Sequence, residues 1–198
     1  MIVIGITGPT GSGKTTALAQ LEKLGLEVVD CDALYHRMLS ESESLRAALE
    51  GAFGPVFLPD GGLDRAALAR RVFSDRGELN RLNAIVFPAV GAAVEGRIAV
   101  CRRRGLVIDA INLIESGMGR LCDVTVAITA PPQVRMGRIM ARDGINEERA
   151  MERIRAQKND QYYRQHCSFL LENRAGSREE FSTLIHEFFS DLLQDMEE

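Results

Sequence analysis

The sequence predicts an α/β fold in which a five-stranded parallel sheet is flanked by helices. Three observations support this prediction. Short runs rich in Val and Ile recur along the chain, segments with helical spacing of apolar residues lie between them, and a glycine-rich turn joins the first run to the first helix. Continuous β-branched runs are typical of parallel strands that are buried on both faces. At 198 residues the chain is long enough for one such domain, and we expect a single domain over 1–198.

The first strand is expected at 2–7, and its helix at 15–23. Between them the sequence Gly-Pro-Thr-Gly-Ser-Gly-Lys-Thr, at 8–15, fills every fixed position of the P-loop pattern G-x-x-x-x-G-K-[ST]. Glycines let successive backbone N–H groups approach phosphate oxygens at the positive end of a helix. Lys14 would then reach the β- and γ-phosphates, and the Thr15 hydroxyl would hold Mg²⁺. The alternative is a turn that merely links strand to helix, and the strand and helix around the motif argue against it.

The second strand is expected at 27–30 and ends in Asp30-Cys31-Asp32, just before a helix. Carboxylates at the carboxyl end of a parallel strand lie on the ligand-binding edge of the sheet. Aspartate also caps helices, so either Asp30 or Asp32 could serve as the N-cap. Beside a P-loop we expect one of the two to cap the helix and the other to face the substrate.

The segment 41–104 contains helical patterns and no convincing strand. It is longer than an ordinary crossover between two parallel strands. We therefore interpret it as a helical insertion beside the phosphate site that forms one wall of the acceptor pocket. Helices are expected within it at 44–53, from the cap at Asp64 through 73, at 79–86 and, after Pro88, through 102.

The third strand is expected at 106–110, with Asp109 near its end. A hydrophobic strand that ends in an acid is typical of a Walker-B position, whose carboxylate assists Mg²⁺ directly or through water. Because this pattern is common, it indicates a metal-binding carboxylate only when the same chain also contains a P-loop. A fifth strand is expected at 169–172, and Ser177 with Glu180 forms a capping box for the last helix.

A fourth strand at 124–129 leads into the helical segment 132–166, which is rich in arginine. Arg138 and Arg142 are four residues apart and so share a helix face. The alternative is a solvated, ion-paired helical surface. With a P-loop in the same chain, we interpret 132–166 as a phosphoryl-transfer lid, which excludes water and spreads transition-state charge over guanidinium groups.

Composition excludes several other classes of protein. The net charge of −4 argues against a general nucleic-acid binder, which usually carries a basic face. The four cysteines form no C-x-x-C pair and the three histidines have no metal-ligand spacing, so neither a zinc site nor a disulfide framework is expected. We expect no signal peptide, because the first strand begins at Ile2, and no apolar run is expected to approach membrane-spanning length. We expect a cytoplasmic protein without nucleic-acid or membrane partners; its oligomeric state stays open.

The order of these motifs resembles that of the dephospho-coenzyme A kinase family, from the first strand to about Gly176. The P-loop is shared by many families, whereas the second and third of the four segments below are more specific. The segments are 5–15, then 25–32 with its Asp-Cys-Asp, then 63–88 with Leu-Asp-Arg-Ala-Ala-Leu, Val-Phe, Leu-Asn and Pro88, and finally 138–176 with Arg138, Arg142-Asp143, Arg153-Ile154, Gln157 and Asn173.

The resemblance implies a P-loop NTPase fold and transfer of the γ-phosphoryl group of ATP, with Mg²⁺, to the ribose 3′-hydroxyl of dephospho-coenzyme A. It further implies that Asp32 orients or deprotonates that hydroxyl. Motifs and resemblance together assign four groups of residues. They are catalytic Lys14, Asp32, Arg138 and Arg142; nucleotide-binding Gly8, Pro9, Thr10, Gly11, Ser12, Gly13, Lys14, Thr15, Thr16 and Asn173; substrate-binding Asp32, His36, Arg65 and Asn112; and metal-binding Thr15 and Asp109.

The chain departs from the family pattern on the acceptor side. Ile111 stands where the family has Pro, Asn112 where it has Leu, and Phe87 where it often has His. A kinase of another nucleoside, nucleotide or small metabolite is therefore an alternative. A nucleotide-switch protein is a weaker one, because the sequence has no Asn-Lys-x-Asp guanine motif and an arginine-bearing lid has no purpose in a pure switch.

Overall fold

The computed structural model describes residues 1–196, apart from the side chains of residues 73 and 74. It divides into two compact units. The sheet unit comprises Met1–Val29 and Val100–Glu198, and the helical unit comprises Asp30–Ala99.

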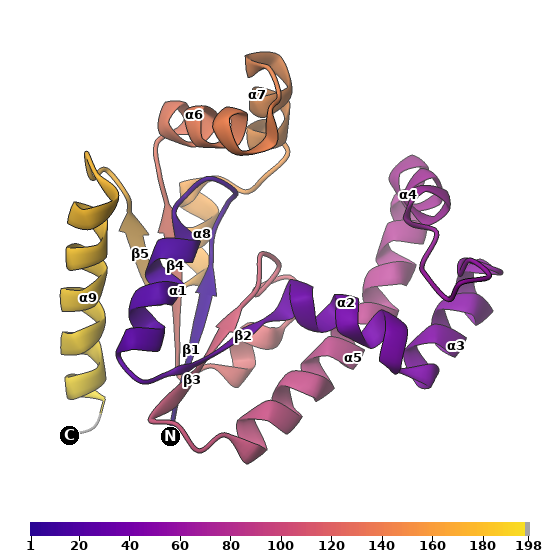
Figure 1. Ribbon diagram of the computed structural model, residues 1–198, viewed down its shortest axis with the longest axis horizontal. Coiled ribbons are helices and arrows are strands. Elements are labelled where there is room, and N and C mark those ends of the chain that lie inside the picture. Colours follow the sequence, from indigo (N-terminus) through magenta and orange to yellow (C-terminus); the bar gives the residue numbers. More distant parts are fainter. Residues whose placement is uncertain (197–198) are drawn as a thin grey trace. The chain divides into compact units, whose positions relative to one another are not determined.

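The sheet has five strands in the order β2-β3-β1-β4-β5 (Figure 1). β1 pairs in parallel with β3 on one side and β4 on the other, and β4 pairs in parallel with β5. All five expected strands are confirmed to within one residue. Their bounds are Ile2–Thr7 (β1), Glu27–Asp30 (β2), Gly105–Asp109 (β3), Val124–Thr129 (β4) and Phe169–Glu172 (β5).

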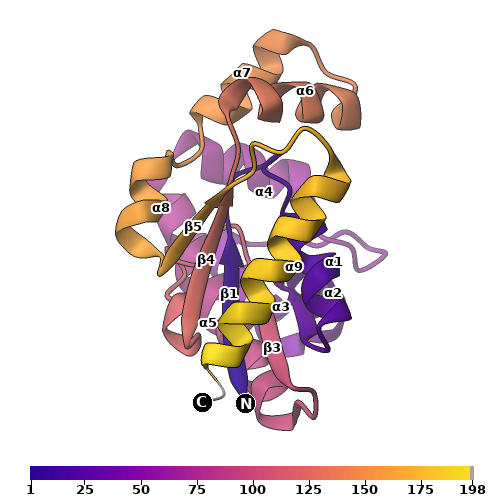
Figure 2. The same ribbon diagram turned by 90° about the vertical axis from the view of Figure 1, so that its left-hand side faces the viewer.

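The core of the sheet unit lies between the sheet and the helices α1 and α9, which run side by side (Figure 2). Apolar residues of both helices, such as Leu21 and Phe181, pack there against Ile4 and Val126 of the central strands. A short 3-10 helix at Met118–Leu121 was not expected from the sequence. The helices of this unit are Lys14–Lys23 (α1), Pro132–Asp143 (α6), Glu147–Arg155 (α7), Asp160–His166 (α8) and Arg178–Asp195 (α9).

α9 begins with the expected capping box. The Ser177 hydroxyl accepts a hydrogen bond from the Glu180 amide at 3.0 Å. The Glu180 carboxylate reaches back one residue further than usual and accepts from the Gly176 amide at 2.8 Å. These bonds satisfy amide groups that a helix start leaves without partners, and they fix where the apolar face of α9 begins.

The helical unit contains α2 (Cys31–Glu41), α3 (Glu43–Phe53), α4 (Arg65–Ser74) and α5 (Arg76–Val100). α5 runs on through Pro88, so the expected division into two helices was wrong. Proline inside a helix removes one N–H group and costs about 3 kcal/mol. Leu82, Ile85 and Ala89, on both sides of the proline, pack against a cluster of buried residues from the rest of the helical unit, and this packing offsets the cost. The cluster comprises Leu39, Leu45, Leu49, Phe53, Val56, Leu68 and Val72.

By length and composition alone, α5 is a helix that could cross a membrane, although no apolar run of that length was expected. It is the single candidate within residues 1–196. Leu79, Leu82 and Ile85 of α5 pack partly buried against apolar residues of the helical unit, whereas 11% of the most apolar 18-residue window of α5 is buried.

Candidate phosphoryl-transfer site

The loop between β1 and α1 has the backbone of an anion-binding turn. Gly8, Gly11 and Gly13 have φ values of 134°, 78° and 106°, which residues with a Cβ adopt only with strain. A Cβ on Gly8 would lie 2.0 Å from the carbonyl oxygen of Ile128. α1 begins directly after the loop, so its first N–H groups and its positive end face the loop.

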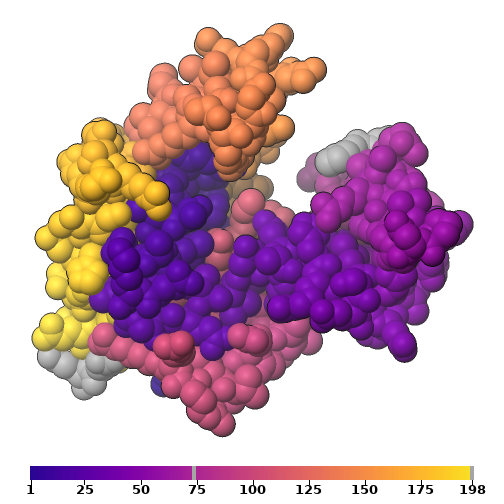
Figure 3. Space-filling view, viewed as in Figure 1, coloured from indigo at the N-terminus to yellow at the C-terminus, as the bar shows by residue number. Residues whose placement is uncertain are grey.

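The loop encloses a pocket of about 190 Å³, which we call the P-loop pocket. The Lys14 ammonium donates to the Gly8 carbonyl oxygen at 3.0 Å and so extends across the loop. In the sheet unit, α6 and α7 lie above the segment that holds the loop (Figure 3). Three cations therefore gather at a pocket made largely of backbone. The lining residues are Pro9, Thr10, Gly11, Ser12, Gly13, Lys14, Thr15, Arg138, Ile139 and Arg142.

The two arginines on the α6 face have different partners. The Arg138 guanidinium donates to the carbonyl oxygens of Gly11 and Ser12 at 3.0 and 3.2 Å. Arg142 instead donates twice to the Asp143 carboxylate, at 2.7 and 3.0 Å, and Arg153 also pairs with this carboxylate. Hydrogen bonding between Arg142 and Asp143 lowers the pKa of the Asp143 carboxyl group and raises the pKa of the Arg142 guanidinium. Arg138 thus contacts the loop, whereas Arg142 is held by a carboxylate.

Arg135 and Gln157 hold the loop in place through hydrogen bonds, although the sequence predicted no role for either residue. Arg135 is 5% exposed, and its Nε donates to the Thr10 carbonyl at 2.9 Å. Its Nη2 donates to Gln157 Oε1 at 2.6 Å, and the same oxygen accepts from the Thr10 amide at 3.1 Å. Burial lowers the pKa of the Arg135 guanidinium. The only signal for Gln157 in the sequence was its place in the family pattern.

Asn173 lies directly beneath the loop, at the end of β5. It is 2% exposed, and its amide nitrogen donates to the Ser12 carbonyl at 3.0 Å. Within residues 1–196, its side-chain oxygen and the hydroxyls of Ser12 and Thr129 are buried without a hydrogen-bond partner. Leaving such groups unpaired destabilises a protein, and they are common where a ligand or water supplies the missing partner. Asn173, one of the expected nucleotide residues, thus contacts the phosphate-binding loop, and Thr16, another, lies in the first turn of α1.

Oxygen donors suited to Mg²⁺ occur at the same edge of the sheet. Asp109 is paired in register with Ile6 of β1, close to where the loop begins, and the Thr15 hydroxyl is exposed at the start of α1. No cluster of three metal-binding side chains occurs in the described part of the chain. This fits Mg²⁺, which usually takes one or two protein oxygens and completes its shell with water and phosphate. Asn112 is exposed in the turn after β3.

The helical unit separates the roles of its two aspartates. The Asp30 carboxylate caps α2 by accepting from the Ala33 amide at 2.9 Å, whereas Asp32 is exposed in the first turn. His36 lies one turn after Asp32, and so on the same helix face. Its Nδ1 is 3.3 Å from the Arg65 guanidinium. The structure thus brings the three expected acceptor-side residues of this unit together.

The chain is similar to kinases of small molecules. A family model described as dephospho-CoA kinase matches residues 2–179. The dephospho-CoA kinases of Moorella thermoacetica and Thermobifida fusca are 40% and 32% identical; the matches cover 79% and 97% of this chain, and 76% and 96% of those proteins. The crystal structure of TT1252 from Thermus thermophilus has a TM-score of 0.79 at 33% identity, with 98% and 97% covered. A shikimate kinase from Acinetobacter baumannii, at 16% identity and TM-score 0.53 with 96% and 94% covered, shares the fold.

Proposed function

The chain belongs to the dephospho-CoA kinase family, and we propose that it transfers the γ-phosphoryl group of ATP to the ribose 3′-hydroxyl of dephospho-CoA, releasing CoA and ADP. The observation that carries the proposal is the P-loop pocket, where Lys14, Arg138 and Arg142 gather around the backbone of residues 9–15. Such a site positions and neutralises a triphosphate, which is most of what phosphoryl transfer requires of a protein.

Lys14 and the loop amides would hold the β- and γ-phosphates. Lys14 now bonds the Gly8 carbonyl, and a phosphate oxygen would replace that neutral acceptor with a charged one, which makes a stronger hydrogen bond. Thr15 and Asp109 would hold Mg²⁺, which neutralises charge on the phosphates when it is bound. Arg138, already at the loop, would stabilise the charge that develops on the transferring group.

Asp32 would act on the acceptor. Its carboxylate is exposed and is not engaged in capping, because Asp30 caps α2. Asp32 would accept the hydroxyl proton as the ribose oxygen forms its bond to the γ-phosphorus. The bond between that phosphorus and the oxygen that bridges it to the β-phosphorus breaks at the same time, and ADP leaves. His36 and Arg65 would bind the substrate beside it.

A kinase with a different small-molecule acceptor is the second candidate. It is favoured by Ile111 and Asn112, which are exposed in the turn after β3 where this chain departs from the family pattern.

The deciding experiment is to measure ADP release from ATP and Mg²⁺ with dephospho-CoA, adenosine, uridine or no acceptor. Release that depends on dephospho-CoA supports the proposal, and release with another acceptor supports the second candidate. Lys14→Ala is the control, because loss of its ammonium should abolish turnover while the melting temperature stays unchanged. Turnover that persists in folded Lys14→Ala would contradict the role given to the loop.

A further inference from the structure

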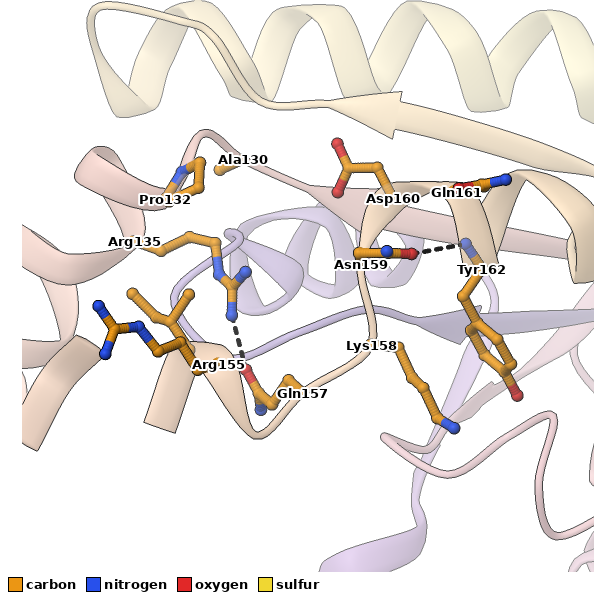
Figure 4. A pocket seen from close by; sticks show the side chains of 11 residues that line it. Ala130, Pro132, Arg135, Arg155, Gln157, Lys158, Asn159, Asp160, Gln161 and Tyr162 are labelled. Carbon is orange, nitrogen blue, oxygen red and sulfur yellow. Dashed lines mark hydrogen bonds between the residues drawn. The ribbon is translucent and has the colours of Figure 1, made fainter. Parts of the chain in front are cut away.

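A second cavity in the sheet unit, of about 700 Å³, has no part in the mechanism above (Figure 4). Pro132 and Arg135 of α6 line one side of it. The segment that joins α7 to α8 lines the other side, and we call this space the α7–α8 cavity. Its volume lies within the usual range for small-molecule sites. The remaining lining residues are Ala130, Ile154, Arg155, Gln157, Lys158, Asn159, Asp160, Gln161 and Tyr162.

This cavity and the P-loop pocket share a wall. Thr10 lines the P-loop pocket, and its carbonyl accepts the hydrogen bond from Arg135, which lines the α7–α8 cavity. Gln157 lines the same cavity and accepts from the Thr10 amide. A P-loop holds the β- and γ-phosphates, so an acceptor that receives the γ-phosphoryl group lies within reach of this wall.

The charges that line the cavity favour an anion. Arg135 is almost completely buried, and it donates hydrogen bonds to the neutral oxygens of Thr10 and Gln157, while the charge of Asp160 acts on it from nearby. Lys158 lies 3.9 Å from the Glu115 carboxylate, at the limit of an ion pair, and 4.6 Å from the centre of the Tyr162 ring. Asp160 is the one acid among the lining residues. A phosphate group beside Lys158 would therefore gain a charged partner at little cost in broken ion pairs.

The remaining lining suits a chain that combines amide and aliphatic groups. Ala130, Pro132 and Ile154 provide apolar surface. Gln157 and Gln161 add side-chain amides, and the side chain of Gln161 is exposed. Figure 4 shows Gln157, Lys158 and Tyr162 following one another along the cavity. Lys158 stands between Gln157 on one side and Gln161 on the other, so a ligand whose phosphates meet Lys158 and whose amide-containing chain continues toward Gln161 matches this arrangement.

Building on the proposed function, we propose that the α7–α8 cavity binds the diphosphate and pantetheine arm of dephospho-CoA. Lys158 pairs with the diphosphate, the side-chain amides bond the peptide-like groups of the arm, and the apolar residues cover its dimethyl group. The cavity would then select this acceptor over a nucleoside that carries the same ribose hydroxyl without the arm.

The test compares Lys158→Ala and Gln161→Ala with Arg164→Ala, an exposed cation on α8 outside the cavity. Dephospho-CoA turnover is measured alone and with AMP or 4′-phosphopantetheine as inhibitors. AMP carries the ribose but lacks the arm, and 4′-phosphopantetheine is the arm alone. In Lys158→Ala, the KM for dephospho-CoA and the inhibition constant of 4′-phosphopantetheine should both rise about tenfold, because a charged partner is lost. The inhibition constant of AMP and the KM for ATP should not change.

Equal weakening of AMP and dephospho-CoA in Lys158→Ala would overturn the assignment, as would an unchanged KM or an equal loss in Arg164→Ala. Wild-type protein that 4′-phosphopantetheine does not inhibit would also overturn it. Should Lys158→Ala fail to fold, Gln161→Ala carries the same comparison, because the Gln161 side chain is exposed and its truncation should leave the fold intact. Wild-type protein with no dephospho-CoA turnover would contradict the proposed function itself, an outcome distinct from a variant that loses only affinity for the arm.

Discussion

The amide of Thr10 in the phosphate-binding loop donates to the side-chain oxygen of Gln157, 147 positions later in the chain, at 3.1 Å. The same oxygen accepts from Arg135, whose Nε bonds the Thr10 carbonyl. Both peptide groups at Thr10 are therefore fixed by residues of α6 and of the segment between α7 and α8. Donors that are oriented before the ligand arrives need no reorganisation when charge develops, so this brace preorganises the loop.

Gln157→Ala should raise the KM for ATP about tenfold, because it removes two hydrogen bonds of about 1 kcal/mol each, partly replaced by water. The dependence of ADP release on ATP concentration measures this, with calorimetric titration of ATP as a second reading. Gln165→Ala, an exposed glutamine on α8, is the matched control. Equal ATP affinity in wild type and Gln157→Ala would show that the brace does not organise the loop.

Asp32→Asn should lower kcat at least about a hundredfold and leave the KM for ATP unchanged, because a general base contributes roughly 10²–10⁴ in rate. Asp30→Asn is the control next to it. Asparagine caps helices as well as aspartate does, so α2 should keep its stability and kcat should change little. Steady-state kinetics with dephospho-CoA measure both values of kcat. A larger loss of kcat in Asp30→Asn than in Asp32→Asn would show that Asp30, and not Asp32, acts on the acceptor.

Gly8→Ala should destabilise the fold more than Gly25→Ala does. Both glycines have positive φ, 134° and 89°, so each substitution costs on the order of 1–2 kcal/mol in backbone strain. A Cβ at Gly25 meets nothing within 4 Å, whereas one at Gly8 would lie 2.0 Å from the Ile128 carbonyl oxygen. Urea unfolding of both variants measures the difference, and equal midpoints would mean that the loop moves away from β4 without cost.

Cys122 and Cys167 should react slowly with iodoacetamide in the native protein at pH 8.5. Burial raises the pKa of Cys122 to about 12 and that of Cys167 to about 11, so both are thiols at this pH, and the thiolate is the reactive form. Cys167 should begin to react at lower pH than Cys122. Peptide mapping by mass spectrometry follows each site, and native rates equal to those in urea would contradict the shifts.

Local sequence predicted the strands because each is a short apolar run with clear ends, as at Ile2–Thr7 and Val124–Thr129. It failed at Pro88, where local propensity favours a break. The packing of Leu82 and Ile85 against helices far away in the sequence keeps α5 continuous instead. The 3-10 helix at Met118–Leu121 has no periodic pattern that would reveal it.

The sequence by itself determined the phosphate-binding loop, because Gly8, Gly11, Gly13 and Lys14 act through backbone conformations and contacts within a few residues. The tertiary structure decided which side chains support that loop. Arg135 and Gln157 on their own could equally well be surface residues of a charged helix. The folded chain places them under Thr10, because packing of α6 and the α7–α8 segment on the sheet brings together positions that no local pattern connects.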